Sequence, residues 1–190
     1  MQLTTFTILA GAAVASVSAA VLAPEPEPAP EPAFQKFSLT AVLEDAPFNN
    51  GSISASKGKL WLLLPANKED AQCDGEYQRT TFFVDAEQLL LYHGDFDSHQ
   101  RIFANSPTYG GWGSLDYFNN SDGETRDWQV QDSRLSFNDQ DWVACSEDDG
   151  SYSVFVDAGQ RITGGGRLCV PFQAAVVNET EPVSCEYTVQ

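Results

Sequence analysis

The segment His93-Gly94-Asp95-Phe96-Asp97-Ser98-His99 has the composition of a metal-binding site. His, Asp, Asp and His recur at every second position, and on an extended strand all four would point to one face. Imidazole and carboxylate ligands suit zinc or a similar ion. Gly94 and Ser98, however, favour a turn, and a turn breaks the alternation. We therefore expect a solvated polar loop here, with no bound metal and no other cofactor.

Catalytic motifs are hard to find in this chain. Its only two histidines lie in the loop just described, and a hydrolytic triad needs a histidine to relay protons. The glycine-rich stretch 110–114 has neither the spacing of a nucleophile elbow nor the phosphate-loop pattern. Acidic residues crowd the loops between Asp122 and Asp149, but none follows the calcium-loop signature. We expect no enzymatic activity and assign no catalytic residue; a secreted hydrolase with a carboxylate pair is the less favoured alternative.

Aromatic side chains offer a different chemistry, because their flat faces can stack on the apolar faces of sugar rings. The candidates are Trp61, Trp112, Trp128, Tyr109 and Tyr117. Tryptophan in a β domain is more often partly buried in the core. Tyr109 and Trp112 lie in a loop rich in glycine and proline, where a large ring has fewer partners to pack against. These two are therefore the possible glycan-binding residues.

Residues 1–20 have the features of a secretory signal peptide. An apolar run from Phe6 to Val17 is followed by small residues that suit a cleavage site, although no Lys or Arg precedes the run. The run is too short for a stable membrane anchor, and no second apolar stretch approaches the length of a transmembrane helix. We expect a secreted, extracellular protein.

Export places the four cysteines of the chain in an oxidising compartment. Cys73, Cys145, Cys169 and Cys185 are therefore expected to form disulfides rather than to act as nucleophiles or metal ligands. Four cysteines allow three pairings. We favour Cys169–Cys185, which closes a short C-terminal loop, together with Cys73–Cys145, which would bridge distant strands. Each disulfide should stabilise the fold by about 3–4 kcal/mol.

Residues 21–33 form a linker dominated by proline and glutamate, a composition that favours extended polyproline II. The linker is either a semi-rigid spacer or a remnant of export. Residues 34–190 are enough for one domain with its own hydrophobic core. The net charge of −17 disfavours nucleic acid and anionic membrane surfaces as partners. We expect a monomer.

Three Asn-x-Ser/Thr sequons offer glycosylation sites in a secreted chain. Their acceptors are Asn50, Asn119 and Asn178.

Apolar residues after Phe34 recur with the period of strands rather than of helices. Strands are predicted at 37–41, 60–64, 152–156, 168–172 and 174–177. Two hairpins are predicted, with strands 80–84 and 89–92 around a turn at 85–88, and strands 128–130 and 135–137 around a turn at 131–134. The sequence predicts an all-β fold, a single compact domain of short strands stabilised by disulfides. The related order of residues in the two hairpins favours a β-trefoil-like arrangement, with a β-sandwich as the alternative.

Several stretches of the chain match the pattern of a known family. They are TTFFVDAEQLLLYHG (80–94), GWGSLDYF (111–118), WQVQDSRLSF (128–137), ACSEDDGSYSVFVDAG (144–159) and CVPFQAAVVNETEPVSCEY (169–187). With a looser match over 37–64, the chain resembles the fungal secreted family that contains the phialide cell-wall protein PhiA and sequences labelled IgE-binding protein. That family often has a further cysteine between Leu60 and Cys73, which this chain lacks.

The resemblance implies a secreted, non-catalytic, cell-wall-associated structural or interaction protein of a filamentous fungus. It implies a role in wall assembly or conidiation, and partners among cell-wall polysaccharides or wall proteins. It supplies no catalytic residues. The alternative function is a lectin-like module that recognises wall glycans through Tyr109 and Trp112.

Overall fold

The computed structural model describes six stretches of the chain, built from β-strands and loops. The described residues are 34–75, 79–94, 99–105, 112–118, 125–157 and 168–189. Among them, the only helical element is one short turn of 3-10 helix, η1 (Ala66–Lys68). This part of the chain therefore contains no helix with the length and apolarity that a membrane span requires. The predicted all-β fold class is confirmed.

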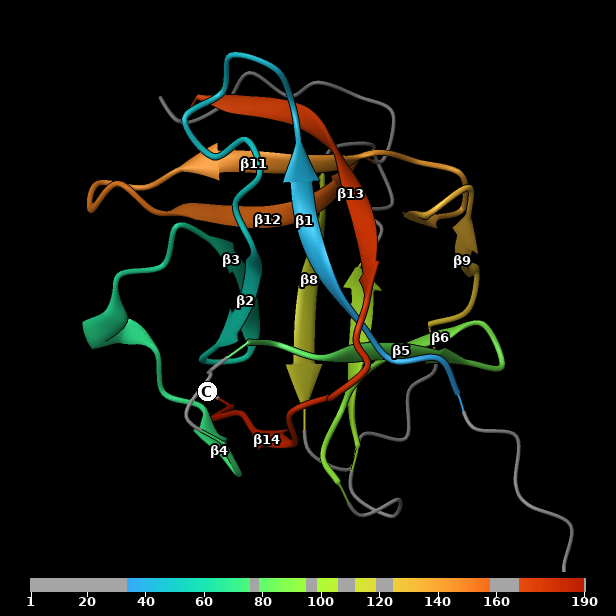
Figure 1. Ribbon diagram of the computed structural model, residues 1–190. Coiled ribbons are helices and arrows are strands. Elements are labelled where there is room, and N and C mark those ends of the chain that lie inside the picture. Colours follow the sequence, from blue (N-terminus) through green and yellow to red (C-terminus); the bar gives the residue numbers. More distant parts are fainter. Residues whose placement is uncertain are drawn as a thin grey trace, which may run out of the picture. The chain divides into compact units, whose positions relative to one another are not determined.

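The strands run from β1 to β14 along the sequence (Figure 1). Their bounds are β1 (Phe37–Val42), β2 (Ile53–Ser56), β3 (Lys59–Leu62), β4 (Gln72–Cys73), β5 (Phe82–Asp85), β6 (Gln88–Leu91), β7 (Gln100–Asn105), β8 (Trp112–Phe118), β9 (Trp128–Gln131), β10 (Arg134–Phe137), β11 (Trp142–Ser146), β12 (Tyr152–Asp157), β13 (Cys169–Asn178) and β14 (Cys185–Glu186). Within the described ranges, β4 and β14 form a small separate sheet, and the other strands form one sheet of 12.

The antiparallel ladders of the large sheet close into a ring. β1 pairs with β5, and the path continues through β6, β7 and β8 to β12, β11 and β13, which pairs back with β1. Hairpin β9–β10 joins this ring where β10 pairs with β13, and hairpin β2–β3 joins it at β8 and β12. A closed path leaves fewer open strand edges to pair with other chains. The preference for a β-trefoil-like arrangement over a β-sandwich stays a prediction.

The longest ladder joins β1 to β13, from Phe37 opposite Asn178 to Val42 opposite Gln173. Side chains of a strand alternate between its two faces. Ala174 is fully buried, whereas its neighbour Gln173 is exposed. The prediction of two short strands at 168–172 and 174–177 is therefore wrong: one strand spans most of both segments, and Gln173 is an outward-facing residue within it.

Large aromatic side chains fill the inner face of the sheet. Trp142 is fully buried, and its Nε1 donates to the Leu135 carbonyl oxygen at 2.9 Å. Trp128 packs against Trp142 with ring centroids 5.7 Å apart. Trp128 and Tyr117 are both buried, so these two candidates for sugar stacking belong to the core instead. Trp61 is half-buried, and its Nε1 donates to a backbone carbonyl at 3.0 Å.

Two-residue turns join the predicted hairpins. In β5–β6 the turn residues Ala86 and Glu87 have φ of 45° and 64°, and in β9–β10 Asp132 and Ser133 have φ of 50° and 59°. Positive φ at both central residues is the signature of a type I′ turn, whose twist matches that of the flanking strands. Both predicted hairpins are confirmed. Their turns are two residues long rather than four, because the outer residues of each predicted turn already pair across the ladder.

Two disulfides, Cys73–Cys185 and Cys145–Cys169, link neighbouring strands. All four cysteines are paired as expected, but the predicted pairing of Cys73 with Cys145 and of Cys169 with Cys185 is wrong. The reason is strand adjacency. Cys145 in β11 lies opposite Cys169 in β13, and Cys73 in β4 lies opposite Cys185 in β14.

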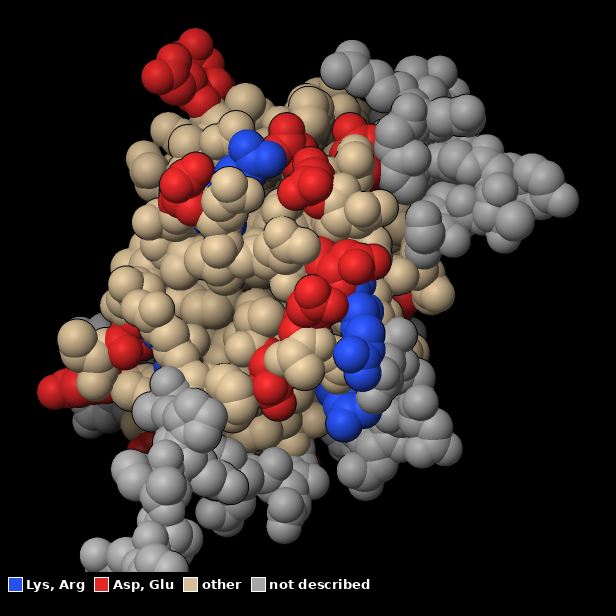
Figure 2. Space-filling model, turned by 90° about the vertical axis from the view of Figure 1, so that its right-hand side faces the viewer, with Lys and Arg blue, Asp and Glu red and all other residues tan. Residues whose placement is uncertain are grey.

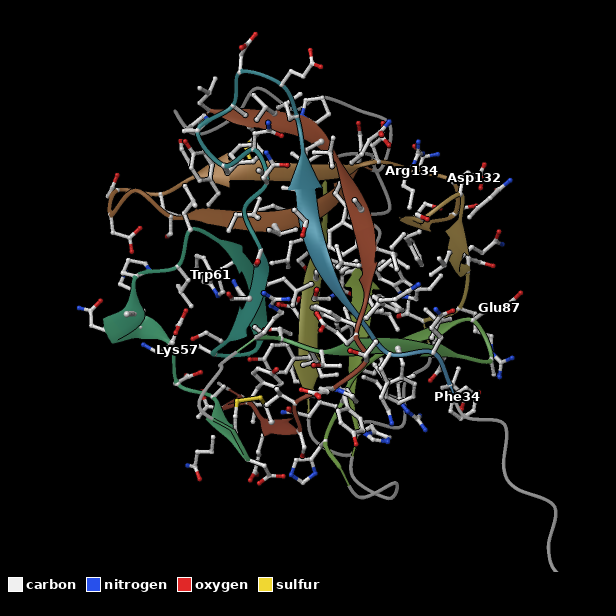
Figure 3. All side chains as sticks on the ribbon, viewed as in Figure 1. Phe34, Lys57, Trp61, Glu87, Asp132 and Arg134 are labelled. Carbon is white, nitrogen blue, oxygen red and sulfur yellow. A yellow bond between two sulfur atoms is a disulfide. The ribbon has the colours of Figure 1, made fainter. Side chains whose placement is uncertain are left out.

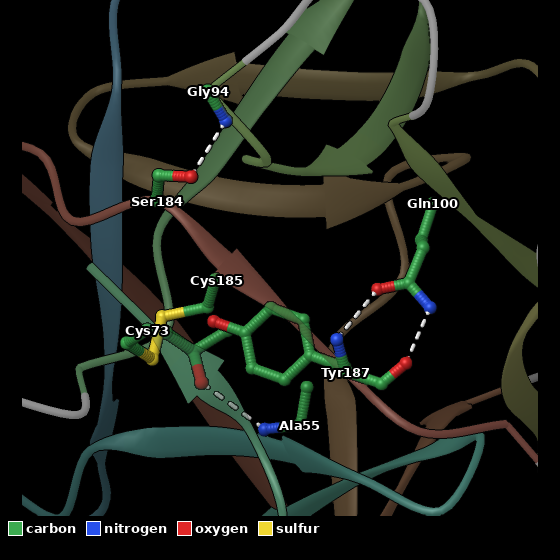
Figure 4. Close-up of a disulfide and its surroundings, with 8 residues drawn as sticks. Ala55, Cys73, Gly94, Gln100, Ser184, Cys185 and Tyr187 are labelled. Carbon is green, nitrogen blue, oxygen red and sulfur yellow. Dashed lines mark hydrogen bonds between the residues drawn. A yellow bond between two sulfur atoms is a disulfide. The ribbon is translucent and has the colours of Figure 1, made fainter.

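Residues 184–189, which we call the C-terminal strap, are bonded to several separate parts of the chain. The Gln100 side chain contacts both backbone groups of Tyr187: its Nε2 donates to the carbonyl oxygen at 2.7 Å, and its Oε1 accepts from the N–H at 3.1 Å (Figure 4). The Gly58 N–H and the Tyr117 hydroxyl both donate to the Thr188 carbonyl oxygen, at 3.0 and 3.1 Å. The strap therefore completes the hydrogen bonding of loops and strands that precede it by up to 130 residues.

Candidate functional site

A cleft of about 580 Å³ on the outer face of the sheet is the candidate site. It lies where β1, β13 and β10 run next to one another, beside the turn of hairpin β9–β10. We refer to it as the β10–β13 cleft. Its lining residues are Val42, Gln131, Asp132, Ser133, Arg134, Ser136, Asp139, Gln173 and Ala175. Figure 3 labels Asp132 and Arg134 at the β9–β10 hairpin.

The cleft follows from strand alternation around a small side chain. On β13, Ala174 faces the core, so its neighbours Gln173 and Ala175 face outward. On β10, Leu135 is fully buried, and Arg134 lies opposite Ala175 on the outer face. Because Ala175 carries only a methyl group, the floor of the cleft stays low beside the long side chain of Arg134.

Two turns close the ends of the cleft. The first, between β9 and β10, contains Asp132 and is held against β13, because the Ser133 carbonyl oxygen accepts from the Val176 N–H at 2.8 Å. The second follows β10 and contains Asp139. A strand advances about 3.3 Å per residue, so the four residues of β10 separate the backbones of the two aspartates by about 10 Å or more.

The cleft carries a net negative charge. The Arg134 guanidinium forms an ion pair with the Asp141 carboxylate, with 3.2 Å between Nη2 and Oδ1. This pair balances the one cation among the lining residues, while Asp132 and Asp139 form no ion pair within the described part of the chain. Figure 2 faces the side of the molecule on which β9 lies, and it shows acidic side chains spread over that surface with few Lys or Arg.

Several polar groups of the cleft are left for a ligand or for water. Ser136 is only 7% exposed yet lines the cleft, and its hydroxyl makes no hydrogen bond to another described residue. Among the same residues, the side-chain amides of Gln131 and Gln173 have no partner either. Buried polar groups are normally hydrogen-bonded, so a nearly buried hydroxyl at the cleft surface calls for a partner from outside the protein. The arrangement suits a ligand rich in hydroxyl groups.

The two histidines lie close together, and the two aspartates between them fall outside the described residues. The His93 backbone N–H donates to Nδ1 of His99 at 3.2 Å. Burial first, and then the nearby His93 and Lys36, lower the pKa of His99. The His99 ring packs edge-on against Phe83, with centroids 4.7 Å apart. No group of His, Cys, Asp or Glu in the described ranges is arranged to hold a metal ion.

The predicted glycan-binding residues are only partly placed. Tyr109 lies outside the described residues. Trp112 is the first residue of β8, and its backbone lies opposite Asp157. Its side chain is not among the parts that the structure describes. Glycan binding by these two residues stays a prediction.

The predicted glycosylation acceptors are also partly placed. Asn50 is exposed in the loop between β1 and β2, and Asn178 is exposed at the end of β13. Asn119 lies outside the described residues. Use of the three sequons stays a prediction.

The acidic charge, the two disulfides and the all-β fold together are typical of a secreted protein. The chain belongs to the family of PhiA-like secreted proteins, whose model matches residues 37–188. This confirms the resemblance found in the sequence and establishes the protein as a secreted one.

Relatives with the printed name "Cell wall protein phiA" match along nearly the whole chain. The protein from Aspergillus fumigatus is 28% identical over 196 residues, which cover 99% of this chain and all of the relative. The protein from Emericella nidulans is also 28% identical, over 197 residues with the same coverage of both chains. The protein from Aspergillus niger is 25% identical over 162 residues, covering 81% of this chain and 86% of the relative. No solved structure is significantly similar to the chain.

Proposed function

We propose that the protein is a non-catalytic component of the fungal cell wall, which acts through contacts with wall polysaccharides or other wall proteins. Residues 1–20 direct export, residues 21–33 act as a linker, and residues 34–190 make the contacts. Its role lies in wall assembly or in the formation of spore-bearing cells.

The observation that carries the proposal is the full-length similarity to relatives named cell wall proteins. The geometry of the cleft supports such contacts. Asp132 and Asp139 lie at opposite ends of β10 and polar side chains line the space between them, so the cleft is suited to holding a ligand along its length.

Wall association can be tested in a filamentous fungus that expresses the full chain with an epitope inserted in the linker, where it leaves the C-terminal strap unchanged. Washed walls are extracted first with salt and then with hot detergent, and each fraction is probed for the epitope. We expect most of the protein in the wall fractions. A secreted protein without wall affinity, carrying the same epitope, serves as the control. Recovery of this protein in the medium to the same extent as the control would overturn the proposal.

The non-catalytic part has its own assay. Purified protein is incubated with chitin, glucan and mannan, and the release of reducing ends is followed. We expect no release above that of a reduced and unfolded sample. Steady release that disappears in Asp132→Asn or Asp139→Asn would show that the protein is a hydrolase.

The second candidate function is glycan binding by a lectin-like module. The polar β10–β13 cleft favours it, independently of Tyr109 and Trp112. A pull-down on the same polysaccharides with the wild type and Trp112→Ala tests the role of that ring. Equal retention of both proteins would remove Trp112 from the binding surface, and no retention of the wild type would remove the lectin function.

A further inference from the structure

We propose that the β10–β13 cleft binds a stretch of polysaccharide whose sugar units carry protonated amino groups. The inference rests on the proposed wall association and names the class of wall component that is recognised. The shape of the cleft, its free hydrogen-bonding groups and its charge each point to this ligand.

The shape suits a polymer. The cleft lies on the outer surface of the sheet, with a floor formed by β13 and with a turn at each end of β10. Its two aspartates are spaced along β10 by about 10 Å or more, which is a separation of more than one sugar ring. A chain of sugars can therefore lie along the cleft and contact both ends through successive units.

The hydrogen-bonding groups suit sugar hydroxyls, which both donate and accept. The amides of Gln131 and Gln173 each offer a donor and an acceptor, and the guanidinium of Arg134 offers donors in a planar fork. Ser136, nearly buried and without a partner among the described residues, adds a hydroxyl at the cleft surface. The methyl group of Ala175 provides a small apolar surface for the C–H groups of a ring.

The charge distinguishes an amino sugar from a neutral one. Asp141 balances the charge of Arg134 at 3.2 Å, which leaves Asp132 and Asp139 as two uncompensated carboxylates. Because they are spaced along the cleft, they match a ligand with repeated positive charges. The net charge of −17 on the whole chain attracts such a polycation and repels acidic polysaccharides.

The test is calorimetric titration of the secreted protein with short glucosamine oligomers, compared with N-acetylglucosamine oligomers of the same length, which are neutral. We expect the glucosamine oligomer to bind and the neutral oligomer to bind at least about tenfold more weakly. The double variant Asp132→Asn/Asp139→Asn should weaken glucosamine binding by about tenfold or more. Ala175→Tyr, which fills the floor of the cleft without changing any charge, should weaken it to a similar extent.

The matched control is Asp74→Asn/Asp148→Asn, which removes the same charge at two exposed carboxylates outside the cleft. Its binding should stay within about twofold of the wild type, because exposed charges away from a contact contribute little. Unchanged thermal unfolding of each variant establishes that it is folded. Equal weakening in the cleft and control variants would reduce the effect to general attraction between a polycation and an acidic protein, and would overturn the proposal.

Two further outcomes also overturn it: no binding of the glucosamine oligomer, or binding of both oligomers with equal affinity. The extraction experiment described above separates this failure from that of the proposed function. If the protein stays in the wall but does not bind glucosamine oligomers, the proposed function stands and the proposed ligand is wrong. If the protein binds the oligomers but is absent from the wall, the proposed ligand stands and the proposed function is wrong.

Discussion

The two disulfides should contribute unequally to the free energy of unfolding. Cys73–Cys185 spans 112 residues, and Cys145–Cys169 spans 24 residues within that loop. When a disulfide acts by restricting the unfolded chain, its contribution grows with the logarithm of the loop length. Removing the outer disulfide should cost about 4.6 kcal/mol, because the inner one shortens the effective loop to about 88 residues. Removing the inner disulfide should cost about 3.5 kcal/mol.

The variants are Cys73→Ala/Cys185→Ala and Cys145→Ala/Cys169→Ala, each of which retains the other disulfide. Unfolding in urea without reductant gives the free energy of each, and peptide mapping establishes that the remaining disulfide is the native one. Single domains are stable by about 5–15 kcal/mol, so the loss of the outer disulfide should remove about a third of the stability or more.

The expected difference between the two variants is about 1 kcal/mol, with the outer pair costing more. Equal losses, or a larger loss for the inner pair, would refute the reasoning from loop length. Hydrogen exchange gives an independent readout. Without Cys73–Cys185, the amides of the C-terminal strap should lose protection before those of β11 and β13, because the strap then loses its covalent link to β4 and is held by its hydrogen bonds and by the burial of Tyr187.

Three further predictions concern buried polar groups. Trp142→Phe should lower the free energy of unfolding by about 1–2 kcal/mol more than Trp128→Phe does. The Nε1 of Trp142 donates to a backbone carbonyl, whereas the Nε1 of Trp128 has no acceptor within the described residues. Equal urea midpoints of the two variants would contradict this. Gln100→Met should lower the free energy of unfolding by about 2–4 kcal/mol, because it leaves both backbone groups of Tyr187 without partners. The control Gln129→Met, on the exposed part of β9, should change it by less than about 0.5 kcal/mol. Burial raises the pKa of Tyr187 from 10.0 to about 12, so between these pH values the native state holds this proton more tightly than the unfolded state, and stability should fall as pH rises. In a pH series of urea midpoints, Tyr187→Phe should show a shallower fall, and an unchanged slope would rule out this residue as a contributor.

The hairpins were predictable because their evidence is local. Around Ala86 and Glu87, and again around Asp132 and Ser133, a short polar turn separates two apolar runs. The exact turn type was not predictable, because neither pair of turn residues is the Asn-Gly sequence that signals a type I′ turn. Strand β11, which carries the buried Trp142, was not predicted, although the turn residues Asp149 and Gly150 between β11 and β12 were a local signal for that hairpin.

The disulfide pairing and the cleft were not predictable because both depend on which strands are neighbours. Cys145 and Cys169 meet because β11 pairs with β13, and nothing in the residues around either cysteine reports that pairing. The cleft likewise needs β10 beside β13, so that Arg134 comes to lie opposite Ala175, some 40 residues further along the chain. Along the sequence, Ala175 is one small residue in an apolar strand; only the sheet makes it the floor of a site.

The C-terminal strap has a consequence for how the protein matures. The Thr188 carbonyl oxygen accepts hydrogen bonds from Gly58 and Tyr117, and Tyr187 is held by Gln100. Because synthesis runs from the N-terminus, these earlier residues lack their native partners until the strap has left the ribosome. The native fold can therefore be reached only once translation of the strap is complete. A chain that stops before the strap would leave these hydrogen-bonding groups without partners, and we expect the quality-control machinery of the secretory pathway to retain it.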